Sequence, residues 1–584
     1  MREVAIRAGG AAGDGIASVG EVLSKSLSRL GLHVFGLNAY QSVIRGGHVW
    51  FQARAAPERV YSQGDGCDVL YALNPETADV HLPALRAGGF LVYDPEKFPI
   101  AAEKVPVGAR AVPIPTLAIA RKYTSQSILQ NAAGLGAAAA LAGIPLETLH
   151  GCLADSFGKK KGEIVDWNLG ASADGYAAAI KEVGSAPPPI ASVGPPKLLL
   201  TGNAAIALGA AAAGCKFLAQ YPMTPASSIM HWMAAHSREL GVVVKQAEDE
   251  LAAINMAIGA SFGGVRSMTA TSGGGFSLMV EALGMAGMME VPLVVVESQR
   301  SGPSTGLPTK TEQGDLNLML GAGQGEFPRA ILAPSHPIEA YHAAIRAFEL
   351  AEAWQTPILL ASDLHLSESY ATVDRSEIAF PDAPPSLFSV APNGHDYLRY
   401  AYTENGVSPR SLPGQPGLQY VSGSDEHDEK GHLVSDVKSG IPIWVAERTK
   451  MMDKRMGKLA GLLAATEPPR LEGPAVADLT IVTWGSTLGA VRDAVQLLGQ
   501  RGKTANILLS PTVYPFHSEP FRAIAGRSRK LLLVEANFSG QFGRLARAES
   551  GVELGDRLVK YDGEPFYPME IVAKAEEVLA DGRQ

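Results

Sequence analysis

The residues best placed for chemistry follow four apolar segments between residues 216 and 300. Thr224 stands at a possible helix start, Glu250 enters an apolar helical segment, and Arg300 comes after the fourth segment. Between them, residues 271–275 read T-S-G-G-G, a glycine-rich turn. A carboxylate can transfer a proton, and a guanidinium can hold a planar carboxylate through two hydrogen bonds. These residue types therefore suit a site for an anionic ligand.

The most informative local signal is the segment Y-P-M-T-P-A-S-S at residues 221–228. It follows an apolar run, residues 215–220, that predicts a strand. It also predicts a helix start, with Thr224 as the N-cap and Pro225 in the first helical position. A helix that begins just past a strand offers free N–H groups and the positive end of its dipole to a carboxylate. A well-capped helix without a ligand is the simpler interpretation of this segment alone.

Strands and helices alternate strictly from about residue 204 to residue 362, which predicts a parallel sheet with helices on both faces. The strands are predicted at residues 216–220, 242–247, 266–271, 292–297 and 357–361. Ligands bind beyond the carboxyl ends of such strands. The first four strands would therefore place chemically active residues at that edge. In strand order, these are Tyr221 with Thr224, residues 248–250 (E-D-E), residues 271–275 and residues 298–300 (S-Q-R).

The chain is predicted to be an α/β protein of several domains, because 584 residues exceed what one core can organise. The predicted parts are an N-terminal α/β domain (1–184), a Pro-rich linker (185–197), the doubly wound domain (198–365), an irregular extension and connection (366–470) and a third α/β domain (471–584). The N-terminal domain is expected to begin with a strand (3–8), a glycine-rich turn (9–15) and a helix (16–30), with further strands at 33–37, 69–73 and 90–94. Strands at 479–484, 503–509 and 530–535 are expected in the third domain.

Composition indicates a globular protein, with 46% hydrophobic and 19% charged residues. A net charge of −9 gives no reason to expect nucleic acid as a partner. Met1-Arg2-Glu3 leads straight into a predicted strand, so no signal peptide is expected. Residues 198–215 lack charges, but their Gly and Ala content and Asn203 favour a buried helix over a membrane span. A cytoplasmic protein without a membrane partner is therefore expected.

Together these motifs resemble the α subunit of the 2-oxoacid:ferredoxin oxidoreductases. Y-P-M-T-P is similar to the Y-P-I-T-P signature of that family, and residues 246–279 and 300–310 (R-S-G-P-S-T-G-L-P-T-K) resemble its pyrimidine-binding domain. The resemblance continues through residues 399–400, 406–410 (G-V-S-P-R) and 426–429 (E-H-D-E) into a third domain similar to the transketolase C-terminal domain. Residues 9–15 and 44–48 (I-R-G-G-H) resemble a γ subunit fused in front, a Rossmann-like domain. The 2-oxoglutarate type with this γ–α fusion is the most similar.

The resemblance assigns roles to individual residues. Glu250 would hydrogen-bond the aminopyrimidine ring of thiamine diphosphate and promote loss of its C2 proton, with Glu248 as the rival for this role. An acidic residue favoured by the helix dipole is the simpler interpretation of Glu250. Thr224 and Arg300 would hold the carboxylate of a 2-oxoacid, and Thr309 would line the substrate pocket. Three further residues would lie against the cofactor: Tyr221, as a packing residue, Ser272 and Gly273.

The groups that bind the diphosphate and carry electrons are expected on a second chain. Thiamine enzymes hold the diphosphate through Mg²⁺ bound to a Gly-Asp-Gly motif that a pair of asparagines follows. G-D-G occurs at residues 13–15 and 64–66, but neither triplet has such a pair after it. Cys67, Cys152 and Cys215 are too widely separated for an iron–sulfur or zinc site. The resemblance therefore implies a β subunit that carries Mg²⁺ and the iron–sulfur cluster.

The predicted function is half of a shared active site. With its β partner, the chain would convert 2-oxoglutarate, coenzyme A and oxidised ferredoxin to succinyl-CoA, CO₂ and reduced ferredoxin, reversibly, so that a reductive TCA cycle could use the reaction. Two α and two β chains are expected. Pyruvate, indolepyruvate and branched-chain 2-oxoacids are alternative substrates. A non-catalytic nucleotide-binding regulatory or assembly subunit is the alternative from another class.

Four weaker motifs have simple interpretations. The glycine-rich turn at residues 9–15 is either a tight turn or a contact for the phosphates of coenzyme A, and Asn38 where an acid would be needed argues against NAD. The lysine run 159–161 predicts a solvated loop. The acidic and histidine cluster at residues 426–432 also predicts a solvated loop or a subunit contact rather than a metal site. Residues 484–487 and 535–537 are expected to serve packing and assembly.

Overall fold

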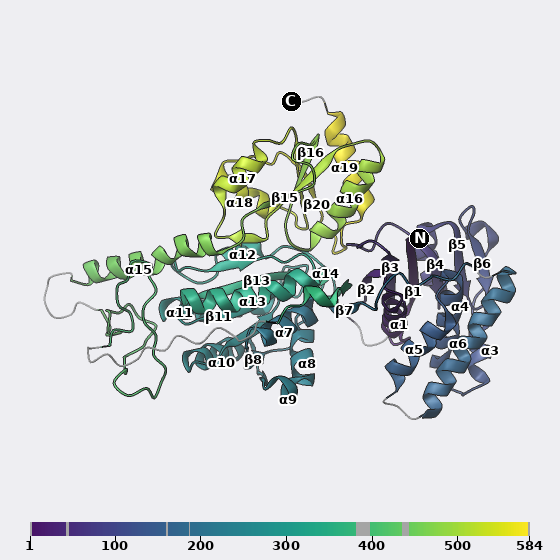
Figure 1. The fold of residues 1–584 in the computed structure, drawn as a ribbon, viewed down its shortest axis with the longest axis horizontal. Coiled ribbons are helices and arrows are strands. Elements are labelled where there is room, and N and C mark those ends of the chain that lie inside the picture. Colours follow the sequence, from purple (N-terminus) through teal and green to yellow (C-terminus); the bar gives the residue numbers. More distant parts are fainter. Residues whose placement is uncertain are drawn as a thin grey trace. The chain divides into compact units, whose positions relative to one another are not determined.

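The computed structural model describes residues 3–42, 46–158, 162–185, 187–380, 397–434 and 443–581. These residues form two compact units (Figure 1). One comprises Met1–Thr201, Glu368–Ile378 and Tyr567–Glu570, and the other Gly202–Ser367, Ala379–Phe566 and Ile571–Gln584. Residues 44 and 45 of the predicted γ-type motif and the lysine run 159–161 lie outside the described residues.

The first unit contains one eight-stranded sheet and six α-helices. Its strands are β1 (Val4–Ala11), β2 (His33–Ala39), β3 (His48–Ala56), β4 (Cys67–Ala72), β5 (Leu85–Tyr93), β6 (Arg110–Pro113), β7 (Leu198–Thr201) and β14 (Tyr370–Val373). Its helices are α1 (Ile16–Arg29), α2 (Pro75–His81), α3 (Thr116–Arg121), α4 (Gln130–Ala142), α5 (Leu146–Phe157) and α6 (Gly162–Val183).

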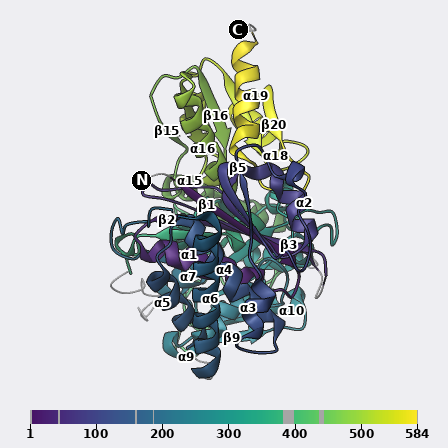
Figure 2. The ribbon, with the colours of Figure 1, turned by 90° about the vertical axis from the view of Figure 1, so that its right-hand side faces the viewer.

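The strand order of this sheet is β6-β5-β4-β1-β3-β2-β14-β7. β1, β4, β5 and β6 run parallel, which is the Rossmann-like part. β3, which the sequence analysis did not predict, runs antiparallel between β1 and β2. Side chains alternate between the two faces, so that Ile6 packs with α1 and α4 whereas Ala5 packs on the α2 side. Figure 2 shows α1, α4, α5 and α6 grouped together.

The second unit contains the seven-stranded and the five-stranded sheet. Its strands are β8 (Phe217–Gln220), β9 (Val243–Gln246), β10 (Ser267–Thr271), β11 (Leu293–Gln299), β12 (Ala330–Leu332), β13 (Pro357–Asp363), β15 (Arg470–Glu472), β16 (Leu479–Thr483), β17 (Ala505–Leu509), β18 (Thr512–Tyr514), β19 (Leu531–Glu535) and β20 (Asp556–Val559). Its helices are α7 (Gly202–Ala212), α8 (Ser227–Ala235), α9 (Ser237–Leu240), α10 (Glu250–Phe262), α11 (Gly273–Met288), α12 (Leu316–Leu320), α13 (Pro337–Trp354), α14 (Leu364–Glu368), α15 (Ile443–Ala465), α16 (Leu488–Gln500), α17 (Ser518–Ala525), α18 (Gln541–Ser550) and α19 (Pro568–Ala580).

The seven-stranded sheet has the order β18-β12-β13-β11-β10-β8-β9 and confirms the predicted doubly wound domain. Its central strands β10, β11 and β13 are buried along their whole length and run parallel, as strands of sheets covered on both faces do. Val295 and Leu359 pack beneath α10 and α11, while α13 packs against β11 and β13. The sequence analysis did not predict β12, which is only three residues long.

β18 comes from the third domain and completes the middle sheet. It runs antiparallel to β12, with Ile331 opposite Tyr514 and Leu332 opposite Thr512. The third domain has its own sheet in the order β15-β17-β16-β19-β20, parallel except for the edge strand β15. Gln313 adds side-chain contacts between the two parts, because its Nε2 donates to the Trp484 carbonyl at 3.0 Å and its Oε1 accepts from the Ala536 N–H at 3.1 Å.

The charge-free stretch 198–215 is not one helix. Residues 198–201 form β7, which pairs with β14 in the first sheet, and α7 begins at Gly202. Asn203 is fully buried in α7. Among the described helices, none combines the length and the apolar character that a bilayer crossing requires.

A buried ion cluster fastens α15, the long green helix of Figure 1, to the middle domain. The Glu290 carboxylate pairs with Lys458 Nζ at 2.6 Å and also with Lys454, and all three side chains are almost fully buried. Burial opposes ionisation of Glu290, but the positive charges of Lys458 and Lys454 outweigh it and hold its pKa below the usual range. Arg399 donates to the Glu290 carbonyl at 2.9 Å. Each charge in the cluster therefore depends on its partners.

Replacement of Glu290 by Ala is expected to destabilise the protein by about 3–5 kcal/mol, because it leaves two buried lysines uncompensated. Glu349→Ala, which removes an exposed partner of Arg346, should cost less than about 1 kcal/mol. Urea unfolding of both variants measures the two costs. Equal shifts of the midpoint would contradict the assigned role of the cluster.

Candidate functional site

The predicted site residues follow strands that end at one edge of the middle sheet. β8, β10 and β11 are parallel neighbours, with Met268 opposite both Leu218 and Val294. Their carboxyl ends therefore meet, and the chain leaves them at residues 221, 272 and 300. This geometry explains why three segments far apart in the sequence can share one site.

The turn after β8 differs from its prediction. Thr224 and Pro225 are joined by a cis peptide, and α8 begins two residues later than predicted, with Ala226 at the N-cap and no side-chain cap. Two buried amides hold this turn. Asn203 Nδ2 donates to the Pro225 carbonyl at 2.8 Å, and Gln220 Nε2 donates to the Ala226 carbonyl at 2.9 Å. The prediction of Thr224 as an N-cap was therefore wrong, because long-range hydrogen bonds to the backbone set the start of the helix.

Arg300 is the residue that β11 delivers to the site. The strand continues through Gln299, so Ser298 and Gln299 are buried within the sheet rather than free at its edge. Ser298 Oγ lies 2.5 Å from Ser367 Oγ, and Gln299 Nε2 donates to a neighbouring strand. Arg300 Nη1 donates to the Thr224 carbonyl at 2.8 Å. Two residues predicted to hold one carboxylate are thus in direct contact.

The structure separates the two rival glutamates. Glu250 is the first residue of α10 and is only 3% exposed, whereas Glu248 is exposed before the helix. Asp249 caps the helix, since its Oδ1 accepts from the Ala252 N–H at 2.7 Å. Thr271 Oγ1 donates to Glu250 Oε1 at 3.4 Å. A buried carboxylate at a helix N-terminus beside the next strand end has the position expected of a proton-handling group.

The glycine-rich turn at the start of α11 lies directly against Glu250. A Cβ atom at Gly275 would lie 2.1 Å from Thr271 Oγ1 and 2.3 Å from Glu250 Oε1, so that only glycine fits there. Ser272 is fully buried at the N-cap, and its hydroxyl has no hydrogen-bond partner among the described residues. Backbone and hydroxyl are therefore available beside the carboxylate.

A cavity of about 550 Å³ opens at this edge of the sheet. Its lining includes Met223, Gly273, Gly274, Ser277, Arg300, Ser304, Thr305 and Asp315. Thr271 Oγ1 lies 3.8 Å from Met223 Sδ and so connects the cavity wall to Glu250. Tyr221, which is 37% exposed, and Thr309, which is half-buried, are not among the lining residues.

The sequence analysis missed the carboxyl groups beneath Arg300. Asp315 lines the cavity, and a Cβ at Gly273 would lie 2.3 Å from its Oδ2. Burial raises the pKa of Asp315, and burial together with the nearby Asp315 and Asp363 raises the pKa of Glu297 well above its usual value. Burial also lowers the pKa of Arg300, against the attraction of Asp315. No motif marks Asp315, because its position beside Gly273 is a tertiary contact between segments far apart in the sequence.

The weaker motifs are built into the fold. Asp14 Oδ2 accepts from the Ala11 N–H at 2.8 Å, which closes the N-terminal glycine-rich turn on itself. The solvated-loop interpretation of residues 426–432 was wrong for two of them: His427 is buried with its ring centroid 3.8 Å from that of Tyr400, and Glu426 pairs with Arg455 at 2.9 Å. Within the described ranges, no three His, Cys, Asp or Glu side chains are grouped to hold a metal ion.

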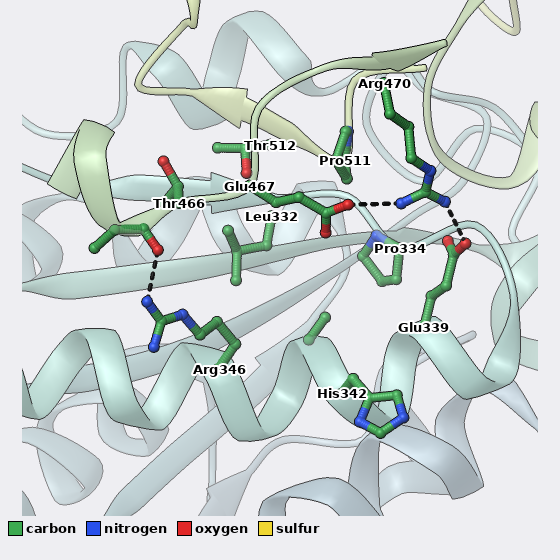
Figure 3. A pocket seen from close by; sticks show the side chains of 12 residues that line it. Leu332, Pro334, Glu339, His342, Arg346, Thr466, Glu467, Arg470, Pro511 and Thr512 are labelled. Carbon is green, nitrogen blue, oxygen red and sulfur yellow. Dashed lines mark hydrogen bonds and ion pairs between the residues drawn. The ribbon is translucent and has the colours of Figure 1, made fainter. Parts of the chain in front are cut away.

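A second cavity of about 420 Å³ lies between α13, the end of α15 and β18 (Figure 3). None of the residues predicted from motifs lines it. Arg470 pairs there with Glu339 at 2.8 Å and with Glu467 at 2.7 Å, and Arg346 donates to the Ala465 carbonyl at 2.6 Å. Both arginines are therefore already paired within the protein, and the first cavity remains the candidate active site.

Three family models match the chain. Residues 208–443 match "Pyruvate flavodoxin/ferredoxin oxidoreductase, thiamine diP-bdg", residues 5–178 match "Pyruvate ferredoxin/flavodoxin oxidoreductase", and residues 474–546 match "Transketolase, C-terminal domain". These matches agree with the three sheets. The domain that holds Glu250, Thr271 and Arg300 is thus of the thiamine diphosphate-binding kind.

Whole-chain relatives lead to the same family. The 2-oxoacid:ferredoxin oxidoreductase subunit alpha of Sulfolobus sp. is 32% identical over 99% of this chain and 97% of that protein. The 2-oxoglutarate oxidoreductase subunit KorA of Mycobacterium tuberculosis is 29% identical over 98% and 91%. A solved 2-oxoglutarate:ferredoxin oxidoreductase from Magnetococcus marinus, with 2-oxoglutarate, coenzyme A and succinyl-CoA bound, is 34% identical, with a TM-score of 0.91 over 99% of this chain and 100% of that chain. The chain therefore belongs to the 2-oxoacid:ferredoxin oxidoreductases, as an α subunit with a γ-like N-terminal domain.

Proposed function

We propose that this α subunit acts on 2-oxoglutarate together with a β subunit. The reaction converts 2-oxoglutarate, coenzyme A and oxidised ferredoxin to succinyl-CoA, CO₂ and reduced ferredoxin, and its chemistry allows both directions. One observation carries the proposal: a buried glutamate and a backbone-anchored arginine lie at one strand-end edge of a thiamine diphosphate-binding domain. Pyruvate, indolepyruvate and branched-chain 2-oxoacids remain the alternatives within the family.

The residues present fit thiamine diphosphate. Glu250 supplies a buried carboxylate, Ser272 a buried hydroxyl without a partner among the described residues, and Gly273 backbone in the cavity lining. The cofactor supplies, when bound, the carbon that attacks the 2-oxoacid. Glu250 would hydrogen-bond the aminopyrimidine ring and so promote its proton transfers, and the close approach of Gly275 holds the carboxylate in place. Tyr221 is exposed and lies outside the cavity lining.

Arg300 and Thr224 are the groups proposed for the substrate carboxylate. The guanidinium is held at the cavity wall by the Thr224 carbonyl, which leaves further N–H groups for a planar anion. Ser304 and Thr305 add hydroxyls to the same lining. The preference for 2-oxoglutarate rests on the names of the Mycobacterium tuberculosis and Magnetococcus marinus relatives. Thr309 stays a predicted pocket residue.

The β subunit is proposed to cover α10 and α11. Three large apolar side chains on these helices are exposed: Leu251 (48%), Met256 (38%) and Leu278 (48%). Exposed apolar groups near a site are candidates for an interaction surface, and here Leu251 directly follows Glu250 and Leu278 lies three residues beyond the glycine-rich turn. All three cysteines are buried and unpaired, so the iron–sulfur cluster is assigned to β. Mg²⁺ is assigned to β because neither Gly-Asp-Gly triplet is followed by a pair of asparagines. We expect a heterotetramer of two α and two β chains that exchanges electrons with ferredoxin.

A non-catalytic regulatory or assembly subunit is the alternative from another class. It relies on nucleotide binding at the N-terminal glycine-rich turn, which Asp14 closes from within. The same turn is the candidate contact for the phosphates of coenzyme A. Co-expression of the chain with its β partner and an assay with a panel of 2-oxoacids tests the proposal. The proposal is supported if the pair turns over 2-oxoglutarate and neither chain does so alone. An inactive pair that binds nucleotide favours the alternative.

Glu250→Gln should slow C2–H exchange of thiamine diphosphate bound to the α/β complex by about 10²–10⁴-fold, the usual size of a lost acid–base group. NMR of acid-quenched samples measures the exchange. Glu248→Gln, two residues away on the exposed side, is the matched control and should exchange like the wild type. Normal exchange in the Glu250 variant would refute the assigned role.

Arg300→Ala should raise the KM for the 2-oxoacid about tenfold or more with a smaller change in kcat, because it removes an anchor for the substrate carboxylate. Steady-state kinetics of the complex give both constants. Arg300→Lys keeps the charge but loses the planar guanidinium, so its KM should lie between those of the wild type and of Arg300→Ala. If KM does not change in the Ala variant, Arg300 does not hold the substrate.

Gly275→Ala should lower the thermal stability of the chain, because its methyl group would collide with Thr271 Oγ1 and Glu250 Oε1. The expected loss is about 1–3 kcal/mol, the usual cost of overpacking. Gly274→Ala is the matched control, since its nearest neighbours would lie 4.0 Å from the new Cβ and alanine favours helix. Scanning calorimetry compares the variants, and equal melting temperatures would show that the turn tolerates side chains.

A further inference from the structure

The γ-like domain contains a cavity of its own, within the first unit and apart from the thiamine site residues. Its volume is about 300 Å³, and helices α1, α4, α5 and α6 contribute to its walls. Most of the lining is apolar, including Val22, Leu135, Leu153, Phe157 and Trp167. An apolar cavity of about 150 Å³ is enough to hold benzene in other proteins, so this one has room for a two-ring molecule.

One polar group in this cavity lacks a partner. Asn131 lines the cavity and is only 9% exposed. Its Nδ2 donates to the Asp14 carbonyl, and because a carbonyl can only accept, the orientation of the amide is fixed. The acceptor Oδ1 then has no hydrogen-bond partner among the described residues. A buried acceptor without a donor costs about 1–3 kcal/mol, which a ligand that donates a hydrogen bond would recover.

The described part of the lining does not suit the charged substrates of the proposed reaction. No Asp, Glu, Lys, Arg or His is among its described lining residues, and the other polar members are the neutral Ser18, Thr124, Gln126 and Asn168. An anionic 2-oxoacid or a phosphate group would lose its hydration there without gaining an opposite charge. The chemistry of the cavity therefore suits an uncharged molecule.

We propose that this cavity is a binding site for a small uncharged ring compound with a single hydrogen-bond donor. The apolar walls hold the ring body, and the donor reaches Asn131 Oδ1. Sites of this kind combine a mainly apolar lining with a few polar groups that fix the orientation of the ligand. Asn131 also donates to the carbonyl of Asp14, so the ligand contacts a residue that is hydrogen-bonded to the one that closes the glycine-rich turn.

Titration calorimetry of the full chain in its α/β complex with indole and indene tests this proposal. The two probes have nearly the same shape, but only indole carries an N–H donor. We expect one saturable site in which indole binds about tenfold or more tightly than indene, the size of one buried hydrogen bond. Equal affinities would refute the assigned role of Asn131, and saturable binding of neither probe would refute the site.

Three variants locate the binding. Asn131→Leu should abolish the preference for indole, so that the two dissociation constants become similar. Gln130→Leu is the matched control, since it also replaces an amide at the start of α4, but outside the cavity lining, and it should keep the preference. Ala132→Leu fills the cavity and leaves Asn131 in place, so it should weaken the binding of both probes about tenfold or more. Circular dichroism checks that each variant is folded, and unchanged binding in folded Ala132→Leu would place the probes elsewhere.

Discussion

The parallel register of β8, β10 and β11 is the constraint on which the site depends. Parallel neighbours must end on the same side, so that the turn after β8, the glycine-rich turn after β10 and Arg300 after β11 meet at one edge. Helix α10 adds Glu250 to this edge, because the Asp249 cap starts the helix where the carboxylate lies against Thr271. The chemistry of the site is therefore a consequence of strand order more than of any single motif.

Much of this arrangement could be predicted from the sequence, because apolar segments and turn residues are local signals. The strands of the middle sheet, the glycine-rich turn and Arg300 belong to this class. The choice between Glu248 and Glu250 needed the burial that only the fold supplies. The helix start after Thr224 was mispredicted because the side chains of Asn203 and Gln220, which lie outside the turn motif, hold the backbone there. Asp315, β3 and β18 were missed for the same reason, since tertiary pairing leaves no short-range pattern.

The described residues between 366 and 470 include two regular elements, β14 and α15, that the sequence analysis did not predict. β14 adds a strand to the first sheet, and the described part of the following excursion is held through Arg399 and His427 against the chain around Glu290. Burial lowers the pKa of Lys454 to about 8, although Glu290 favours its charged form. The sequence predicted an irregular extension and connection here, whereas β14, α15 and buried charge pairs give its described part a defined structure.

The strand that the third domain lends to the middle sheet has a mechanical consequence. Because β18 is hydrogen-bonded to β12, separating the two domains would break backbone ladder bonds rather than slide one side-chain surface over another. A hinge between them at this point is thus disfavoured, because opening it would cost these ladder bonds.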